Sequence, residues 1–311
     1  MTMQEKALSG KLFWPLVILG LLPWFIVQLQ MSVNGDTAWL ATATRRLLAG
    51  ETMVGSFYEV NPPLSLLYYV PPVWLGGFLP VPEYYIIFFY FLVLIALSAF
   101  ALYTIVRHMN FLEDGQRQVL LATYLAGNTI FTAIAIGERE HIVLLGLMPF
   151  LLAQLCLTWG YVLPKRLLWP VMILGTIAVL IKPHFGLLPT LLLLHRMVTK
   201  KSLRSVLLAP DFVSLASGTI AYTAIIWLFF QDYVKIILPD VMALYVPNKD
   251  YANTLPELLT HGYLFLIFMG IEAFFTPVKG RQKHFLMLLY VGALCALIPY
   301  AVQMKGFYYQ L

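Results

Sequence analysis

Charged residues are scarce in this sequence. Asp, Glu, Lys and Arg make up 11% of its 311 residues, whereas hydrophobic residues make up 60% and the mean hydropathy is +0.80. A water-soluble domain has about 25% charged residues, so a soluble fold is excluded. Lipid is the other solvent that could face so much apolar surface, and the sequence therefore predicts an integral membrane protein.

Several chemical signatures are also absent. Both cysteines, Cys156 and Cys295, fall inside apolar runs, so they are expected to be buried hydrophobic residues rather than a disulfide framework. The sequence has no Gly-rich phosphate loop, no Gly-x-Ser-x-Gly elbow and no Cys/His metal pattern. These absences argue against a protein driven by nucleotide hydrolysis in the cytosol. The net charge is +5, but Lys and Arg form short clusters between apolar runs. No nucleic-acid partner is therefore expected, and the clusters indicate membrane topology.

Nine apolar runs of spanning or near-spanning length predict an all-α polytopic membrane protein with about nine transmembrane helices. The predicted helices cover residues 13–30, 84–106, 119–136, 142–160, 167–181, 185–197, 206–230, 262–276 and 285–304. The first run follows Lys6 and Lys11 and has no small-residue cleavage site after it. We interpret it as an uncleaved signal anchor that leaves the N-terminus in the cytoplasm. No internal repeat supports the inverted-repeat pattern of many transporters.

Two neighbouring runs, 167–181 and 185–197, are shorter than the roughly 20 residues that a bilayer requires. The alternative is one long helix from Leu167 to Met197, with the segment around Pro183 in the middle of the membrane. That arrangement would place the basic cluster between Arg196 and Arg204 outside, against the positive-inside rule. We therefore predict two helices joined by a turn.

The outer side of this topology carries most of the acidic residues. Its segments are residues 31–83, 137–141, 182–184, 231–261 and 305–311. The amphipathic pattern from Ala38 to Leu48 predicts a helix in the membrane interface, and a second helical piece is predicted from Glu59 to Tyr69. The loop at 231–261 mixes apolar and polar residues, which predicts short helices that could act as a lid.

Asp36 follows shortly after the first predicted helix, so its carboxylate should stand just above the outer leaflet. It is a preferred N-cap residue, with a helical pattern that starts at Thr37 and a possible stop at Gly50, which favours a capping role. The second interpretation is a general base whose pKa is set by partial desolvation and nearby cations. The two roles are compatible.

Two polar turns supply further candidate residues. The segment Glu138–His141 places four ionisable groups between two apolar helices, and it is either a solvated turn or part of a site. The segment Lys182–His184 places a cation and an imidazole around a helix-breaking proline. Ionisable groups at the level of the membrane surface are functional candidates.

Two kinds of ligand would suit these residues. A phosphate calls for several donors, and the candidate donors are Arg139, Lys182 and His184. A divalent metal could be held by oxygen-rich ligands, and the candidate set is Asp36, Glu138, Glu140 and His141. No ligand spacing demands a metal, so none is assigned.

Several motifs together resemble a known family. They are Asn34-Gly35-Asp36-Thr37, Arg45-Arg46-Leu47-Leu48-Ala49-Gly50 and Glu59-Val60-Asn61-Pro62-Pro63, followed by Gly137-Glu138-Arg139-Glu140-His141 and Lys182-Pro183-His184-Phe185. In this order they resemble bacterial type C glycosyltransferases related to protein mannosyltransferases and lipid A aminoarabinose transferases. The broader families often carry two acidic residues in the first loop, where this chain has Gly35 before Asp36.

The resemblance implies an enzyme of the bacterial inner membrane whose active site faces the periplasm. It implies transfer of a sugar from a polyprenyl-phosphate donor to a glycan, lipid or protein acceptor, with inversion at the sugar carbon. No cofactor is required, although a divalent metal could take part. The related enzymes usually continue for further helices, so we expect a short or truncated member with one domain over residues 1–311.

The resemblance also assigns roles to residues. Asp36 would take the proton from the acceptor hydroxyl, and Arg139, Lys182 and His184 would bind the donor phosphate. Glu138 and Glu140 would act with Asp36 at the catalytic centre, and the supporting residues would be His141, Asn61 and Lys305. We therefore expect Asp36 and the two polar turns to converge on one cavity that opens to the outer face.

Two other functions remain compatible with the same residues. A transporter or flippase would bind and release a polar head group at the charged turns without breaking a bond. A noncatalytic assembly subunit is the third possibility. The Asp36→Asn substitution separates an enzyme from a carrier, because only an enzyme forms a product.

Overall fold

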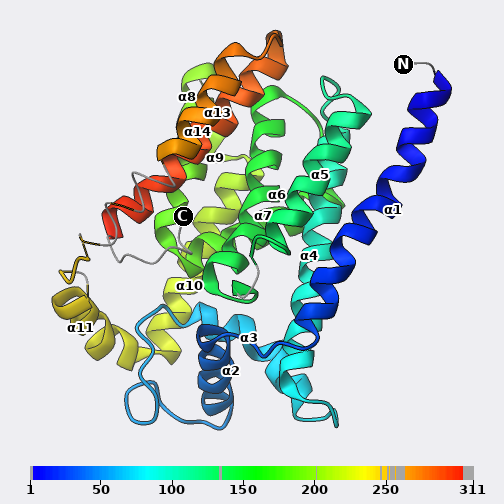
Figure 1. Ribbon diagram of the computed structural model, residues 1–311. Helices are drawn as coiled ribbons and strands as arrows, with labels where there is room; N and C mark the ends of the chain where they lie inside the picture. The colour runs from blue at the N-terminus through cyan, green and yellow to red at the C-terminus, as the bar shows by residue number, and fades with distance from the viewer. Residues whose placement is uncertain are drawn as a thin grey trace. The chain divides into compact units, whose positions relative to one another are not determined.

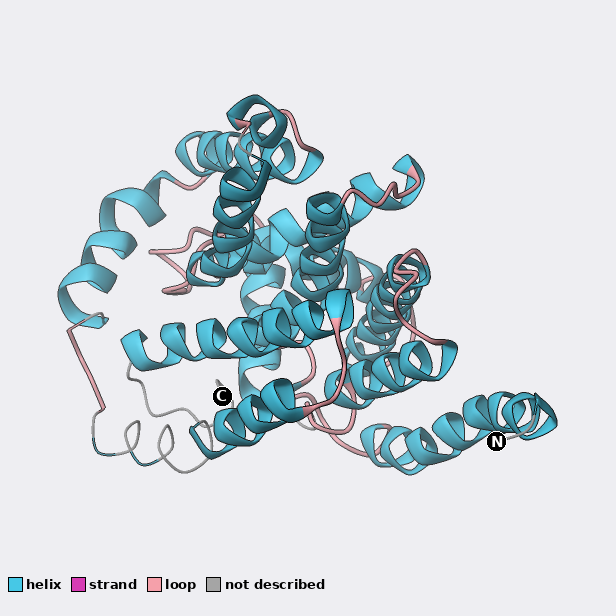
Figure 2. Ribbon diagram, turned by 90° about the horizontal axis from the view of Figure 1, so that it is seen from above, coloured by secondary structure: helices cyan, strands magenta, loops and turns pink. Residues whose placement is uncertain are grey.

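The computed structural model describes residues 3–132, 135–200, 202–245, 247–250 and 263–303, together with residues 252 and 256. All regular structure in these described ranges is helical, as Figure 2 shows, which confirms the predicted all-α fold. Contacts divide the chain into two compact units, residues 1–52 with 64–178 and residues 53–63 with 179–311. Each unit is described by itself, and the single domain expected over residues 1–311 stays a prediction.

The first unit contains six complete helices and most of a seventh. They are α1 (Met3–Gln28), α2 (Gly35–Leu48), α3 (Leu64–Gly76), α4 (Glu83–Arg107), α5 (Asp114–Asn128), α6 (Arg139–Trp159) and α7 (Lys165–Ile181), whose last turn belongs to the second unit. Helix α4 is central and packs against α3, α5 and α6. Its Phe91 and Leu102 side chains are fully buried, as is Phe150 of α6. A Cβ atom on Gly175 of α7 would lie 2.3 Å from the Phe150 side chain, so α6 and α7 approach closely there.

Helices α2 and α3 pack against each other at one end of α4, α6 and α7 (Figure 1). The Thr44 hydroxyl of α2 donates to the carbonyl of Leu66 in α3 at 3.1 Å, and Arg45 pairs with Glu83 at the start of α4. Helix α2 ends at Leu48, and Gly50 follows with φ of +83°, as the predicted stop requires. This packing places the N-terminus of α2 beside the start of α6.

The described part of the second unit contains six α-helices and three other single-turn elements. They are η2 (Pro183–Gly186), α8 (Leu187–Lys200), α9 (Leu203–Leu207), α10 (Pro210–Phe229), η3 (Tyr233–Ile237), α11 (Leu238–Asp240), η4 (Val241–Tyr245), α13 (Tyr263–Phe275) and α14 (Gly280–Gln303), among which α11 is itself a single turn. Helix α14 packs against α13 and α8. The chain is interrupted between α7 and α8, as the prediction of two helices requires.

The segment 53–63 packs with the second unit rather than with α3. Met53 and Phe57 are buried, and the Tyr58 hydroxyl donates to Asp240 at 2.7 Å. The helix predicted from Glu59 to Tyr69 is wrong at its start, because α3 begins only at Leu64. A residue before a proline is disfavoured in the α region, so the tandem prolines 62 and 63 keep the preceding backbone out of the helix.

The predicted helix at 119–136 is also wrong at both ends. Helix α5 begins at Asp114, because Glu113 and Gln116 form a capping box, and it ends at Asn128. The segment 231–261 is helical from Tyr233 to Tyr245, as predicted, and most of its remainder lies outside the described residues.

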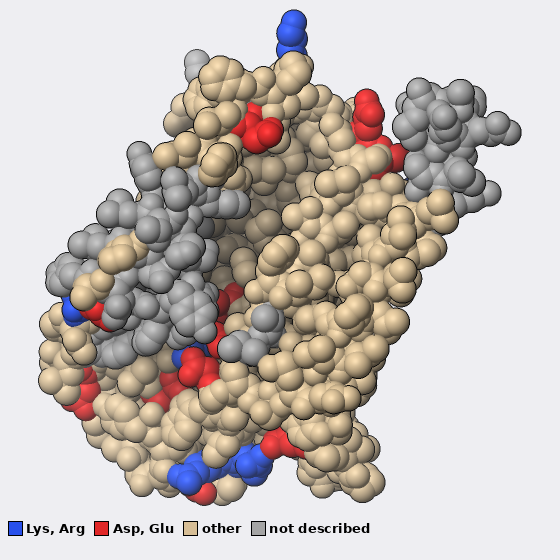
Figure 3. Space-filling view, viewed as in Figure 1, with Lys and Arg blue, Asp and Glu red and all other residues tan. Residues whose placement is uncertain are grey.

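Three helices in the described part of the chain are long and apolar enough to cross a membrane: α4, α6 and α10. Each of the nine predicted runs contains a helix, but nine membrane crossings stay a prediction. Apolar side chains are exposed along these helices, for example Phe100 on α4 and Leu228 on α10. The face in Figure 3 is covered mainly by uncharged atoms, and lipid is the solvent that suits such a surface.

Candidate functional site

The N-terminus of α2 is capped by Asn34 and not by Asp36. The Asn34 Oδ1 atom accepts a hydrogen bond from the backbone N–H of Thr37 at 2.7 Å. Asp36 lies in the first turn, where the helix dipole favours a carboxylate. The capping role expected for Asp36 is therefore wrong, because Asn is an equally good cap and stands one position before the helix. The Asp36 side chain is 47% exposed and is not needed for capping.

The turn that leads into α6 is clamped by α2 and α3. The Thr37 hydroxyl donates to the carbonyl of Ile136 at 2.9 Å, and the Tyr69 hydroxyl donates to the carbonyl of Gly137 at 2.5 Å. Gly137 has φ of +87°, which favours glycine. A Cβ atom there would lie 2.7 Å from the Tyr69 hydroxyl oxygen and 2.9 Å from Phe91. The turn is thus fixed both by hydrogen bonds and by crowding.

Replacing Gly137 by alanine should therefore destabilise the protein by more than backbone strain alone would. Gly160 is a matched control, since its φ is +79° and a Cβ atom there would meet nothing within 4 Å. Both substitutions impose about 1–2 kcal/mol of left-handed strain, and overpacking adds about 1–3 kcal/mol at Gly137 alone. Denaturant unfolding of Gly137→Ala and Gly160→Ala in the same detergent measures the difference. Equal losses of stability would contradict the clamp.

Asp36 and Arg139 lie side by side. Asp36 Oδ2 is 3.6 Å from Arg139 Nη2, and the Arg139 side chain is only 14% exposed. Arg139 is the first residue of α6, where the helix dipole disfavours a cation. The carboxylate from α2 offsets that cost, so the two residues form one small charged site on the first unit.

Glu138, the residue before Arg139, completes this site. It is buried, and its Oε1 atom accepts a hydrogen bond from Asn34 Nδ2 at 2.5 Å. Burial first, and then the nearby Glu140 and Asp36, raise the pKa of Glu138 to about 7, against the opposing effects of Arg139 and Asn34. Its carboxyl group can therefore gain or lose a proton near neutral pH.

The raised pKa of Glu138 also makes the stability of the folded protein depend on pH. Its usual value is 4.5 and its value in the folded protein is about 7, so the folded state holds this proton more tightly than the unfolded chain does. The contribution of this group to stability is fully present below pH 4.5 and is lost as the pH rises through about 7.

His141 and Glu140 support the turn on α6. The Nδ1 atom of His141 accepts a hydrogen bond from the backbone N–H of Gly137 at 3.1 Å, and its ring packs 6.0 Å from the ring of Phe91. The His141 side chain is buried, whereas Glu140 is half-buried. His141 is thus a structural partner of the clamped turn, which suits the supporting role expected for it.

The other predicted site residues belong to the second unit or lie outside the described residues. Lys182 is buried between α7 and η2, and His184 packs 4.7 Å from the ring of Phe185. Asn61 donates through its backbone N–H and its side-chain amide to Glu59 at 2.8 and 2.6 Å. Lys305 lies outside the described residues. Convergence of Lys182 and His184 with Asp36 therefore stays a prediction.

Sequence reasoning missed three residues that build the site: Asn34, Thr37 and Tyr69. The capping preference of Asn could have identified Asn34, because the segment Asn34–Thr37 offers two good caps and only one can be used. Nothing in the sequence pairs Tyr69 with Gly137, because that contact depends on how α3 packs against the start of α6.

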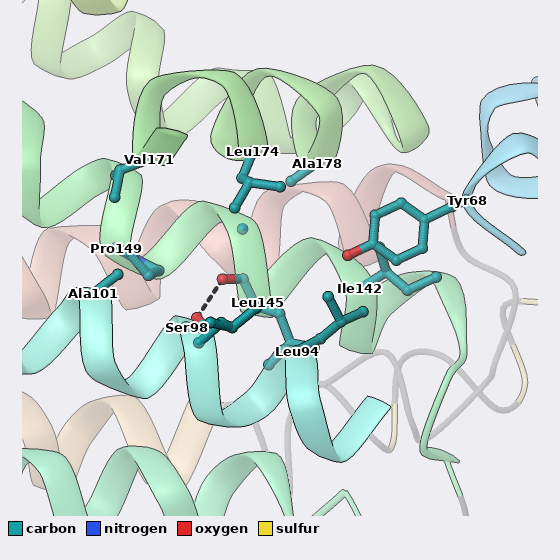
Figure 4. A pocket seen from close by; sticks show the side chains of 12 residues that line it. Tyr68, Leu94, Ser98, Ala101, Ile142, Leu145, Pro149, Val171, Leu174 and Ala178 are labelled. Carbon is teal, nitrogen blue, oxygen red and sulfur yellow. Dashed lines mark hydrogen bonds between the residues drawn. The ribbon is translucent and has the colours of Figure 1, made fainter. Parts of the chain in front are cut away.

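An apolar groove lies between α4, α6 and α7 (Figure 4). Its cavity volume is about 60 Å³. Its walls are stripes of residues at helical spacing, namely Leu94, Leu97, Ser98 and Ala101 of α4, Ile142, Leu145, Gly146 and Pro149 of α6, and Val171, Leu174 and Ala178 of α7, with Tyr68 of α3. The Ser98 hydroxyl donates to the carbonyl of Leu145 at 2.5 Å and is also bonded to Tyr124, so it is satisfied within the protein.

Tyr68 and Ile142 lie together at one end of this groove in Figure 4, with Val171 and Pro149 toward the other. Tyr68 is next in sequence to Tyr69, which holds the clamped turn, and Ile142 is three residues after Arg139 in α6. The first unit therefore contains both a charged site and an apolar groove, to which α3 and α6 each contribute residues close together in sequence.

The metal interpretation gains no support from the described ranges of the chain. Within them, no group of three or more His, Cys, Asp or Glu side chains is arranged to hold a metal ion. One ring nitrogen of His141 already accepts the hydrogen bond from Gly137.

Comparison with protein-family models, with curated proteins and with solved structures finds no match for this chain.

Proposed function

We propose that this protein is a membrane glycosyltransferase that moves a sugar from a polyprenyl-phosphate donor to an acceptor hydroxyl on the outer face of the bacterial inner membrane. The observation that supports it most is that the first unit holds both the charged site around Asp36, Glu138 and Arg139 and an apolar groove lined by Ile142, three residues after Arg139 in α6. A polyprenyl-phosphate sugar has the same two parts, a polar head and a long apolar chain. Outside the cytosol there are no nucleotide sugars, so an activated donor has to arrive on a lipid.

The reaction is one direct displacement at the sugar carbon. Asp36 accepts the proton of the acceptor hydroxyl, and the oxygen of that hydroxyl forms a bond to the anomeric carbon of the sugar. At the same time the bond from the anomeric carbon to the phosphate oxygen breaks. The products are the glycosylated acceptor, with inverted configuration, and the polyprenyl phosphate. Arg139 stabilises the charge that develops on the leaving phosphate, a role that the family resemblance also gives to Lys182 and His184.

Glu138 and Glu140 act beside this base. Glu138 can hold or release a proton near neutral pH because of its burial, and both carboxyl groups can accept hydrogen bonds from sugar hydroxyls. The exposed half of Asp36 leaves the acceptor a path to the carboxylate. The apolar stripes of α4, α6 and α7 hold the first isoprene units of the donor.

Filling the groove tests this proposal. Ala101→Trp places a large ring against the groove wall, and Phe100→Trp is a matched control because Phe100 is 67% exposed on the other face of α4. We expect Ala101→Trp to weaken binding of a long-chain polyprenyl-phosphate sugar by about tenfold or more, equivalent to about 1.4 kcal/mol, and the control to bind normally. Binding is measured by mass spectrometry of lipid retained on the purified protein. Retention by Ala101→Trp equal to that of the wild type would contradict the assignment of the groove.

A transporter or flippase of a lipid-linked head group is the alternative function. It would use the same groove and charged site but release the head group unchanged on the other side of the membrane. Proteoliposomes loaded with a polyprenyl-phosphate sugar separate the two functions. An enzyme converts the lipid to polyprenyl phosphate when the acceptor is present, whereas a carrier moves the intact lipid and forms no product.

A further inference from the structure

We propose that Asn34 is a positioning residue that ties the Glu138 carboxyl group to the N-terminus of α2, and thereby holds Glu138 in place relative to Asp36 and Arg139. This inference rests on the proposed function for its catalytic meaning, but the linkage itself is a property of the first unit. It assigns to Asn34 a second role, beyond that of a helix cap.

The geometry gives Asn34 two different partners through one amide group. Its Oδ1 atom accepts from the backbone N–H of Thr37 at 2.7 Å, and its Nδ2 atom donates to Glu138 Oε1 at 2.5 Å. The first bond belongs to α2, and the second reaches the residue that precedes α6. Any movement of the α2 N-terminus is therefore transmitted to Glu138, and the adjacent Asp36 moves with it.

Capping alone does not require an amide. Ser, Asp and Asn cap helices about equally well, but an ionised Asp has no donor for Glu138, and the Ser hydroxyl, although it can donate and accept, is too short to reach it. A buried carboxylate that loses a hydrogen-bond donor is destabilised by its desolvation. The amide therefore helps Glu138 to carry a charge in this buried position, together with Arg139.

Several charged and titratable groups surround Glu138. Asp36 approaches from α2 and Tyr69 from α3, while Arg139, Glu140 and His141 stand on α6. Asp36 and Glu140 disfavour a charge on Glu138, whereas Arg139 and the Asn34 amide favour it. Removing the amide should therefore shift the balance toward the protonated carboxyl group.

Two variants separate positioning from capping. Asn34→Ser keeps a side-chain acceptor for Thr37 but is too short to reach Glu138, and Asn34→Asp keeps the cap but replaces the donor by a carboxylate. Infrared difference spectra recorded against pH report the Glu138 carboxyl group, identified as the band missing from Glu138→Gln. No substrate is present, so the result is independent of whether the protein transfers sugar.

We expect the Glu138 midpoint to rise by about one pH unit in Asn34→Ser, because the charged carboxylate loses a hydrogen-bond donor. Asn34→Asp should raise it further, and both variants should keep the thermal stability of the wild type at a pH where the Glu138 carboxyl group is protonated, because both retain the helix cap. If Asn34 is only a cap, both variants titrate as the wild type does, which overturns the proposal. A wild-type Glu138 band that does not titrate between pH 5 and 9 overturns it as well.

The activity of the same proteins separates this inference from the proposed function. With a polyprenyl-phosphate sugar as the probe, the pH profile of transfer should shift in Asn34→Ser in the direction of its infrared midpoint. A wild type that transfers no sugar contradicts the proposed function and leaves the infrared result standing. An unshifted infrared midpoint contradicts the linkage even in an active enzyme.

Discussion

Asp36→Asn should lower the turnover of sugar transfer by about 10²- to 10⁴-fold, which is the usual contribution of a general base. The amide cannot accept the proton of the acceptor hydroxyl. The cost to folding should be small, because α2 is capped by Asn34 and because the ion pair of Asp36 with Arg139 is half exposed. Turnover at saturating donor, together with thermal unfolding of the same protein, measures the two effects separately.

Asp114→Asn is a matched control for this experiment. Asp114 also lies in the first turn of a helix, α5, and also pairs with an arginine, Arg117, at 2.7 Å. It is 91% exposed and far in sequence from the charged site, so its replacement should leave turnover unchanged. If Asp36→Asn folds normally and transfers sugar as fast as Asp114→Asn, Asp36 is not the base.

The second large effect concerns stability. Arg196 of α8 donates to both carboxylate oxygens of Asp211 in the first turn of α10, at 2.7 and 2.8 Å, and both side chains are buried. Replacing either residue by alanine leaves a buried charge without its counterion. We expect Arg196→Ala and Asp211→Ala each to destabilise the protein by about 3–5 kcal/mol in denaturant unfolding.

The double variant Arg196→Met with Asp211→Leu provides the internal control. It removes both charges and replaces them by apolar volume, so it should recover most of the stability lost in the single variants. Asp114→Ala, which breaks the pair with Arg117 by removing its exposed partner, should cost no more than about 1 kcal/mol. If the double variant loses as much stability as the two single variants together, the unpaired buried charge is not the cause of their instability.

The fold was largely predictable because helix formation in apolar runs is a local property. The nine predicted runs each overlap a helix, but the run predicted at 206–230 is divided, because α10 begins only at Pro210. The errors fall where local signals compete. Asn34 and Asp36 are both good caps, and the capping box at Glu113 begins α5 earlier than its apolar run does.

The candidate site was predictable only in part. The ionisable residues of the segment Glu138–His141 stood out because a turn does not need so many charges, and the structure brings Arg139 beside Asp36. The hydrogen bond from Asn34 to Glu138 and the clamp from Tyr69 join residues far apart in the chain. Such contacts depend on the packing of α2 and α3 against α6, which no local pattern in the sequence contains.

The central claim is that a sugar is transferred from a lipid phosphate at the charged site. The most direct measurement incubates the purified protein in proteoliposomes with a bacterial lipid extract and follows polyprenyl-phosphate sugars by mass spectrometry. The account predicts that the wild type consumes such a lipid and forms polyprenyl phosphate and a glycosylated acceptor, whereas Asp36→Asn binds the lipid but does not consume it. Identical lipid compositions before and after incubation with the wild type, with no polyprenyl-phosphate sugar bound to it, would contradict the account.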